Sequence, residues 1–147
     1  MRALLFTLLA LPFSALAEEV LLTDIADDLY RVGSSGRYVL TRSCSVDGEN
    51  LKAELSAKSV RFEKRSCEVV AHLTPWVPPE GVHHCKLSQN YSSLYRVWTG
   101  PVKGWILTEP NLALTMIADG EVHVGAPGQK SRVLFDGLDT PVILFLR

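Results

Sequence analysis

The run His83-His84-Cys85 is the densest group of side chains in this chain that could carry chemistry. If the run forms a β-strand, His83 and Cys85 point the same way, because side chains alternate between two faces. Two such ligands suit one Zn or Cu ion, and His72 or His123 could complete the site from neighbouring strands. A free Cys85 beside His83 could instead act as a thiol nucleophile with its base. One reading of the sequence is therefore a metal-dependent or thiol enzyme centred on His83 and Cys85.

The alternative is an ordinary strand whose cysteine is buried or disulfide-bonded, and the rest of the chain favours it. The sequence contains no G-x-S-x-G, no H-E-x-x-H, no phosphate-cradling glycine-rich loop and no C-x-x-C. Asp27-Asp28 and Glu18-Glu19 are adjacent pairs, which point apart on a strand and do not resemble the two carboxylates of a glycosidase. We therefore expect a protein that is not an enzyme and that carries no cofactor and no metal.

A second candidate site combines a cation with an aromatic ring. In the strand-like run 94–98, the alternation of side chains places Arg96 and Trp98 outward together. An arginine beside a tryptophan is typical of a ligand or partner surface, so we expect both residues to bind a partner. In the competing reading, Trp98 only covers a neighbouring loop or linker, and Arg96 extends into solvent. The same alternation indicates four core residues, Tyr95, Val97, Trp105 and Leu107.

Composition limits the class of protein and of partner. The chain has 147 residues, 47% of them hydrophobic and 21% charged, which excludes a disordered or low-complexity protein. Its 15 basic and 16 acidic side chains give a formal net charge of -1. Without a broad positive field, binding to nucleic acid or to anionic lipid is not expected.

The first residues have the pattern of a secretory signal peptide, predicted over residues 1–17. Arg2 precedes an apolar run, and Ala15-Leu16-Ala17 supplies the small residues that a signal peptidase accepts before Glu18. We expect a periplasmic or secreted protein consisting of residues 18–147. The longest later apolar run, 142–146, suits a buried strand and is too short to span a membrane.

Export changes how the three cysteines are interpreted, because an oxidising compartment favours disulfides. We favour a bond between Cys44 and Cys67, since both follow Arg-Ser and both lie in strand-like segments. Closing a loop of that size stabilises the fold by about 3 kcal/mol. A bond between Cys67 and Cys85 is the main competitor, and in either case one thiol remains.

The mature chain consists of short apolar or alternating runs separated by turn residues. About a dozen such runs predict an all-β fold, a small sandwich or barrel. A helix over residues 23–30 competes with the first strands on propensity grounds. Residues 74–81 contain three prolines, which lack backbone donors, and are predicted to link two halves outside any sheet.

An internal repeat is the most informative pattern. Leu29-Tyr30-Arg31-Val32 recurs as Leu94-Tyr95-Arg96-Val97, and later matches keep their order at a spacing of about 61 to 66 positions. One of these later matches is Val60-Arg61-Phe62 with Val122-His123-Val124. The repeat predicts two related units of four or five strands, about 29–77 and 94–142. They should pack as one β domain, because neither can bury its apolar face alone. Tyr30 and Tyr95 should be equivalent, as should Tyr38 and Trp105.

Residues 95–112 resemble the closing hairpin of bacterial Src-homology-three-like domains. The resemblance lies in a strand ending aromatic-x-Val, a glycine-containing turn, and Gly104-Trp105-Ile106. It implies a small β-barrel of a kind that generally binds cell wall or protein. The first half, from Thr41 to Val69, is similar to small exported bacterial proteins with a cysteine pair, which supports the disulfide between Cys44 and Cys67.

Together these observations predict an exported, non-enzymatic binding module. We expect its partner to be a protein or a component of the cell envelope. Small size, export, a disulfide and the absence of a catalytic motif also suit an inhibitor or immunity protein that blocks a periplasmic enzyme. The metal-dependent or thiol enzyme remains the alternative.

Overall fold

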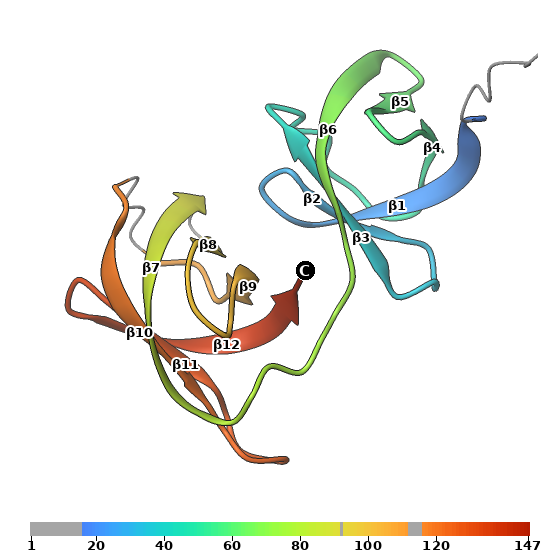
Figure 1. Cartoon of the computed structure of the whole chain (residues 1–147). Coiled ribbons are helices and arrows are strands. Elements are labelled where there is room, and N and C mark those ends of the chain that lie inside the picture. Colours follow the sequence, from blue (N-terminus) through green and yellow to red (C-terminus); the bar gives the residue numbers. More distant parts are fainter. Residues whose placement is uncertain (1–15, 92, 112–115) are drawn as a thin grey trace, which may run out of the picture.

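The computed structural model describes residues 16–91, 93–111 and 116–147. Every regular element in these ranges is a β-strand, and the strands form two related closed barrels (Figure 1). The predicted all-β fold of two related units is confirmed. Residues 1–15 of the predicted signal peptide lie outside the described residues, and the first strand begins at Glu18.

The first barrel contains six antiparallel strands in the order β1-β2-β3-β6-β5-β4. Their bounds are β1 Glu18–Ala26, β2 Leu29–Val32, β3 Arg37–Arg42, β4 Leu51–Leu55, β5 Ser59–Phe62 and β6 Arg65–Leu73. Polar and apolar residues alternate along β5, so its apolar face is buried in the barrel, whereas in β2 only Arg31 is exposed because Leu29 is buried on the outer face. The β2–β3 turn uses Gly33 and Gly36 at positive φ, a conformation that glycine adopts without steric cost.

The second barrel repeats this topology in the order β7-β8-β9-β12-β11-β10. Its strands are β7 Gly81–Tyr91, β8 Leu94–Val97, β9 Gly104–Thr108, β10 Ala118–Val124, β11 Arg132–Phe135 and β12 Leu138–Leu146. Each unit therefore has six strands, more than the four or five predicted. The extra strands include β1 and β7, which precede the repeated Leu-Tyr-Arg-Val, and the one identity that register gives them, Leu22 with Leu87, is too little to reveal the match.

Strand registers define which positions are equivalent. Leu29 pairs with Leu40 and Leu94 pairs with Leu107, so the β2–β3 hairpin corresponds to β8–β9. The sequence alignment fails further on: the strand 59–62 corresponds to 132–135, whereas the sequence matched Val60-Arg61-Phe62 to residues 122–124. Irregular pairing recurs at the same place in both units, after Leu40 and beside Leu107. The loops differ in length, which shifts any alignment made by spacing alone.

Each barrel has its own apolar core, and a third apolar cluster contains residues from both barrels. Registers show that this shared cluster consists of equivalent positions. The equivalent pairs are Leu29 with Leu94, Leu40 with Leu107, Leu73 with Leu146, Tyr38 with Trp105, and Ala71 with Leu144. The two barrels thus bury the same outer face of the same strands, as a pseudo-symmetric pair.

This arrangement corrects the predicted faces of the second unit. Tyr95, Val97, Trp105 and Leu107 are all buried, as expected. However, Tyr95 and Val97 lie inside the barrel, whereas Trp105 and Leu107 lie on its outer face in the shared cluster. The reason is that Tyr95 pairs with Ile106, which therefore takes the interior position that the sequence assigned to its neighbours.

The proline-containing connection between the barrels is partly paired, contrary to the expectation that 74–81 lies outside any sheet. Thr74 and Arg147 exchange two backbone hydrogen bonds of 2.9 and 3.0 Å, and the Trp76 amide donates to the Phe145 carbonyl. Pro75 lies between these donors, where its missing N–H costs nothing. The end of β12 consequently lies between the two barrels (Figure 1).

The predicted disulfide is confirmed, and Cys85 is the free cysteine. Cys44 and Cys67 have a Cα–Cα distance of 5.5 Å, within the range for an unstrained bond. The bond joins the loop that follows β3 to β6. The carboxylate of Asp28 holds the same loop, because it accepts hydrogen bonds from the backbone amides of Ser43 and Cys44.

Candidate functional site

A groove of about 520 Å³ lies on the second barrel where the linker and the end of β6 meet it. The groove is lined by the start of β9, the β8–β9 turn, the linker and the end of the chain. Its side chains of chemical interest are Arg96, Lys103, Arg147, Trp76 and Trp105. Leu73, at the end of β6, adds a wall from the first barrel.

Arg96 and Trp98 lie together, as the alternation of side chains indicates. The guanidinium carbon of Arg96 is 3.7 Å from the centroid of the Trp98 ring and 5.3 Å from that of Trp105. Both side chains are half-buried. Trp98 also covers the outside of β7, where its Nε1 donates a 3.0 Å hydrogen bond to the buried Ser88 hydroxyl. The indole therefore has a structural contact of its own while it holds the arginine in place.

A second arginine–tryptophan pair lies in the same groove. The guanidinium carbon of Arg147 is 4.6 Å from the centroid of the Trp76 ring. The chain has three tryptophans, and each of them contacts a groove arginine. Rigid indole faces and planar guanidinium groups are the residue types enriched at protein interfaces.

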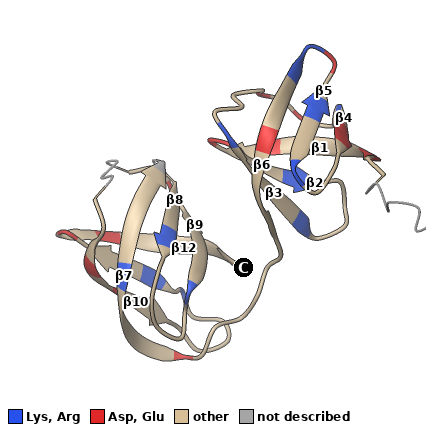
Figure 2. Cartoon of the chain, turned by 45° about the horizontal axis from the view of Figure 1, so that its top comes forward, with Lys and Arg blue, Asp and Glu red and all other residues tan. Residues whose placement is uncertain are grey.

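The groove is also distinct in charge. Arg96, Lys103 and Arg147 line it, and the described part of its lining contains no acidic side chain. Elsewhere the described residues pair cations with carboxylates, as in Arg37–Glu18, Arg61–Glu54, Lys86–Asp119 and Arg132–Asp139. No ion pair between described residues includes any of the three groove cations. Figure 2 shows a blue segment on β8, in the barrel that also contains the end of the chain.

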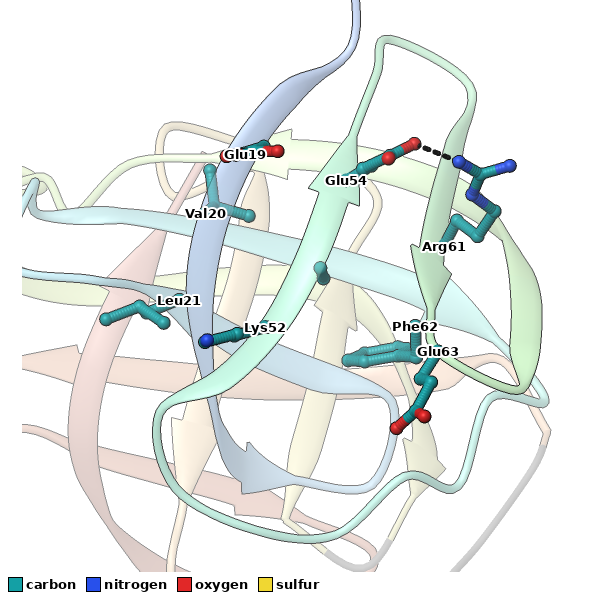
Figure 3. A pocket seen from close by; sticks show the side chains of 9 residues that line it. Glu19, Val20, Leu21, Lys52, Glu54, Arg61, Phe62 and Glu63 are labelled. Carbon is teal, nitrogen blue, oxygen red and sulfur yellow. Dashed lines mark hydrogen bonds and ion pairs between the residues drawn. The ribbon is translucent and has the colours of Figure 1, made fainter.

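A larger groove, of about 800 Å³, lies on the first barrel over β1, β4 and β5 (Figure 3). Its rim carries both signs of charge, with Lys52 and Arg61 among three glutamates. Arg61 and Glu54 neutralise each other at 2.6 Å, as Figure 3 shows. The lining of this groove therefore mixes positive and negative charges, and its described lining residues include no tryptophan.

The histidines and the free cysteine are not brought together. His83 is hydrogen-bonded to the Pro79 carbonyl at 2.6 Å, and His72 to the Ala57 carbonyl in the other barrel. Cys85 packs in the apolar core of the second barrel, and this burial raises the pKa of its thiol to about 11. Such a thiol is almost entirely protonated at neutral pH and is a poor nucleophile. Within the described parts of the chain, no group of three or more His, Cys, Asp or Glu is arranged to hold a metal.

The other two histidines flank one carboxylate on the outer face of β7 and β10. Glu121 lies 2.8 Å from His123 Nε2 and 3.4 Å from His84 Nδ1. The hydrogen bond from His123 lowers the pKa of the Glu121 carboxyl. The carboxylate thus lies between the exposed His84 and the half-buried His123, on the opposite face of the sheet from the core that contains Cys85.

Sequence reasoning identified two residues of the candidate site, Arg96 and Trp98, and missed Trp76, Lys103 and Arg147. Trp76 was assigned only to the linker, although an aromatic side chain between prolines could have drawn attention to it. Lys103 and Arg147 lie outside any periodic pattern. Nothing in their spacing indicates that the linker would bring Trp76 to the end of the chain.

The fold and the groove define a tandem pair of duplicated six-stranded barrels with a cationic, tryptophan-lined groove at their junction. Comparison with known proteins identifies no relative: no family model, no curated protein and no solved structure matches the chain. The described residues contain no helix of the length and apolarity needed to cross a membrane.

Proposed function

We propose that this protein is an exported, non-enzymatic binding module, and that Arg96 and Trp98 contact its partner, a protein or a component of the cell envelope. The observation that carries the proposal is one groove lined by two tryptophans and by three cations that have no ion pair among the described residues, with Trp98 adjoining it through Arg96. Aromatic and arginine anchors in a concave site are the residues that supply most of the free energy at interfaces.

Export is supported by the sequence and is consistent with the fold. The signal-like residues 1–17 end where β1 begins, and Glu18 at that point pairs with Arg37 of β3 at 3.0 Å. The first residue of the predicted mature chain therefore belongs to the barrel. The disulfide between Cys44 and Cys67 suits an oxidising compartment.

Binding is favoured over catalysis by the state of the polar side chains. The thiol of Cys85 is buried and protonated, and His83 is bonded to a backbone carbonyl. The rival function, a metal-dependent or thiol enzyme centred on these two residues, predicts a stoichiometric transition metal or a reactive thiol. Elemental analysis of the purified protein and thiol titration at neutral pH would reveal either one.

The experiment that tests the proposal is capture of partners from periplasmic and envelope extracts on the immobilised mature protein. Arg96→Gln should abolish capture of any partner bound at the groove. The matched control is Arg31→Gln, because Arg31 occupies the equivalent, exposed position of the first barrel and lines neither groove. A partner captured equally by both variants would place the binding surface elsewhere and contradict our assignment. An inhibitor or immunity protein would be recognised by a captured enzyme whose activity it suppresses.

A further inference from the structure

We propose that the groove receives an acidic segment of a partner protein, whose carboxylates bind Arg96, Arg147 and Lys103. The inference rests on the proposed function and adds to it the chemistry of the partner. It depends on three features of the groove: the sign of its charge, the way its arginines are held, and its concave shape.

Charge is the first feature. Three cationic side chains line the groove and its described lining residues include no Asp or Glu, although the chain as a whole has slightly more acidic than basic side chains. Positive charge is therefore concentrated at the groove. Elsewhere on the barrel surfaces, cations are neutralised by a neighbouring carboxylate in ion pairs between described residues. A ligand with negative charge fits this groove, and electrostatic complementarity of this kind selects partners and steers their approach.

The arginines are held by ring contacts rather than by acids. The Arg96 guanidinium lies near the Trp98 and Trp105 rings, and Arg147 lies over Trp76. Contact with an aromatic face uses the plane of a guanidinium and leaves its N–H edge available. That edge matches the two oxygens of a carboxylate, so both arginines are pre-organised for bidentate hydrogen bonds. Pre-organisation reduces the entropy that binding would otherwise cost.

Shape distinguishes a peptide from other anions. The cations line a groove of about 520 Å³, which admits a short extended segment but not a flat surface. A bilayer requires a protruding basic patch, and a nucleic acid requires an extended basic stripe; a chain of net charge -1 supplies neither. Pro101 and the Trp76 ring add apolar walls, which suit the backbone and side chains of a peptide.

Because the three tryptophans line or adjoin the groove, intrinsic fluorescence reports its occupancy without a label. The probe is acetylated hexaglutamate, with hexaglutamine and hexalysine as matched peptides and phosphatidylglycerol vesicles as the membrane arm. We expect hexaglutamate alone to change the emission, with an affinity that falls as salt rises. Arg96→Gln and Arg147→Gln should each weaken binding about tenfold, Arg96→Lys should weaken it less, and Arg31→Gln should leave it unchanged.

Three results would overturn the inference: no response to hexaglutamate, an equal response to hexaglutamine, or a response to vesicles in place of the peptide. Thermal unfolding of each variant verifies that it is folded, and Arg96→Lys keeps the charge if Arg96→Gln does not fold. The two proposals fail separately. A natural partner lost on Arg96→Gln, together with no binding of hexaglutamate, would keep the groove as the site and reject only the acidic partner.

Discussion

Tyr30 and Tyr95 occupy equivalent positions in the two barrels, and each side chain is fully buried against a phenylalanine of its own barrel. The ring centroids are 5.6 Å apart for Tyr30 and Phe62 and 5.9 Å apart for Tyr95 and Phe135. The hydroxyls have different partners: Tyr30 accepts a hydrogen bond from the Val46 amide, whereas Tyr95 donates to Asn111. The two units thus share their core, and they differ where loops close the barrels.

Trp105 is buried in the shared cluster between the barrels, whereas Trp98 is half-buried at the surface, so the two tryptophans should contribute differently to stability. Trp105→Ala should lower the free energy of unfolding by about 3 to 5 kcal/mol, because it removes a buried indole. Trp98→Ala should cost about 1 kcal/mol, mainly the hydrogen bond to Ser88. Urea denaturation followed by circular dichroism measures both. Equal losses in the two variants would contradict the burial of Trp105 in the shared cluster and the surface position of Trp98.

The repeat could be predicted from the sequence because its strongest match falls on a strand with the same role in both units. Leu29 and Leu94 face the other barrel, while Tyr30 and Tyr95 face their own cores, so both faces of this strand constrain its residues. Burial on two sides also explains why Trp105 was assigned to the wrong core. Alternation identifies a buried residue but does not say which of two cores buries it.

The extra strands and the groove could not be predicted from sequence in the same way. Val20 of β1 corresponds by register to Cys85 of β7, and both pack against the core of their own barrel although their residue types differ. The groove depends on residues far apart in the chain, since Trp76 and Arg147 meet only because Thr74 pairs with the last residue. Local spacing contains no information about such a contact.

Mass spectrometry of the exported protein should give an N-terminus at Glu18. Cleavage there leaves β1 intact, whereas removal of Glu18 would delete the carboxylate that pairs with Arg37. Glu18→Gln is the variant that tests the pair, and we expect it to change stability by less than about 1 kcal/mol because both groups are exposed. An intact Met1 in protein recovered from the periplasm or medium would refute the signal peptide.

Non-reducing peptide mapping should show Cys44 linked to Cys67. Reduction should cost about 3 kcal/mol of unfolding free energy, because the bond restricts the unfolded chain. Cys44→Ala/Cys67→Ala should match the reduced protein, and the second barrel, which has no such bond, should be affected only through the shared cluster. A link between Cys67 and Cys85 in the purified protein would be inconsistent with the separate cores of the two barrels.

The free thiol should make the protein less stable in alkali. Burial raises the Cys85 pKa from 9.0 to about 11, so its protonated form is favoured in the folded state. This contribution is complete below pH 9 and is lost as the pH rises through the folded pKa, at a rate of at most about 1.4 kcal/mol per pH unit. Burial also raises the pKa of Tyr30 and of Tyr95, so the wild type alone cannot isolate the thiol.

The variant Cys85→Val isolates the contribution of the thiol to the pH dependence of stability. The equivalent position of the first barrel is Val20, so the substitution inserts the residue that the fold already uses there. The difference in unfolding free energy between wild type and Cys85→Val should be constant up to about pH 9 and should then move in favour of the variant towards pH 11. Urea denaturation at several pH values measures this difference. A thiol reagent at pH 8 should modify Cys85 slowly in the folded protein and rapidly in denaturant. Rapid modification of the folded protein, or a difference independent of pH, would show that the thiol is accessible and would return the thiol enzyme to consideration.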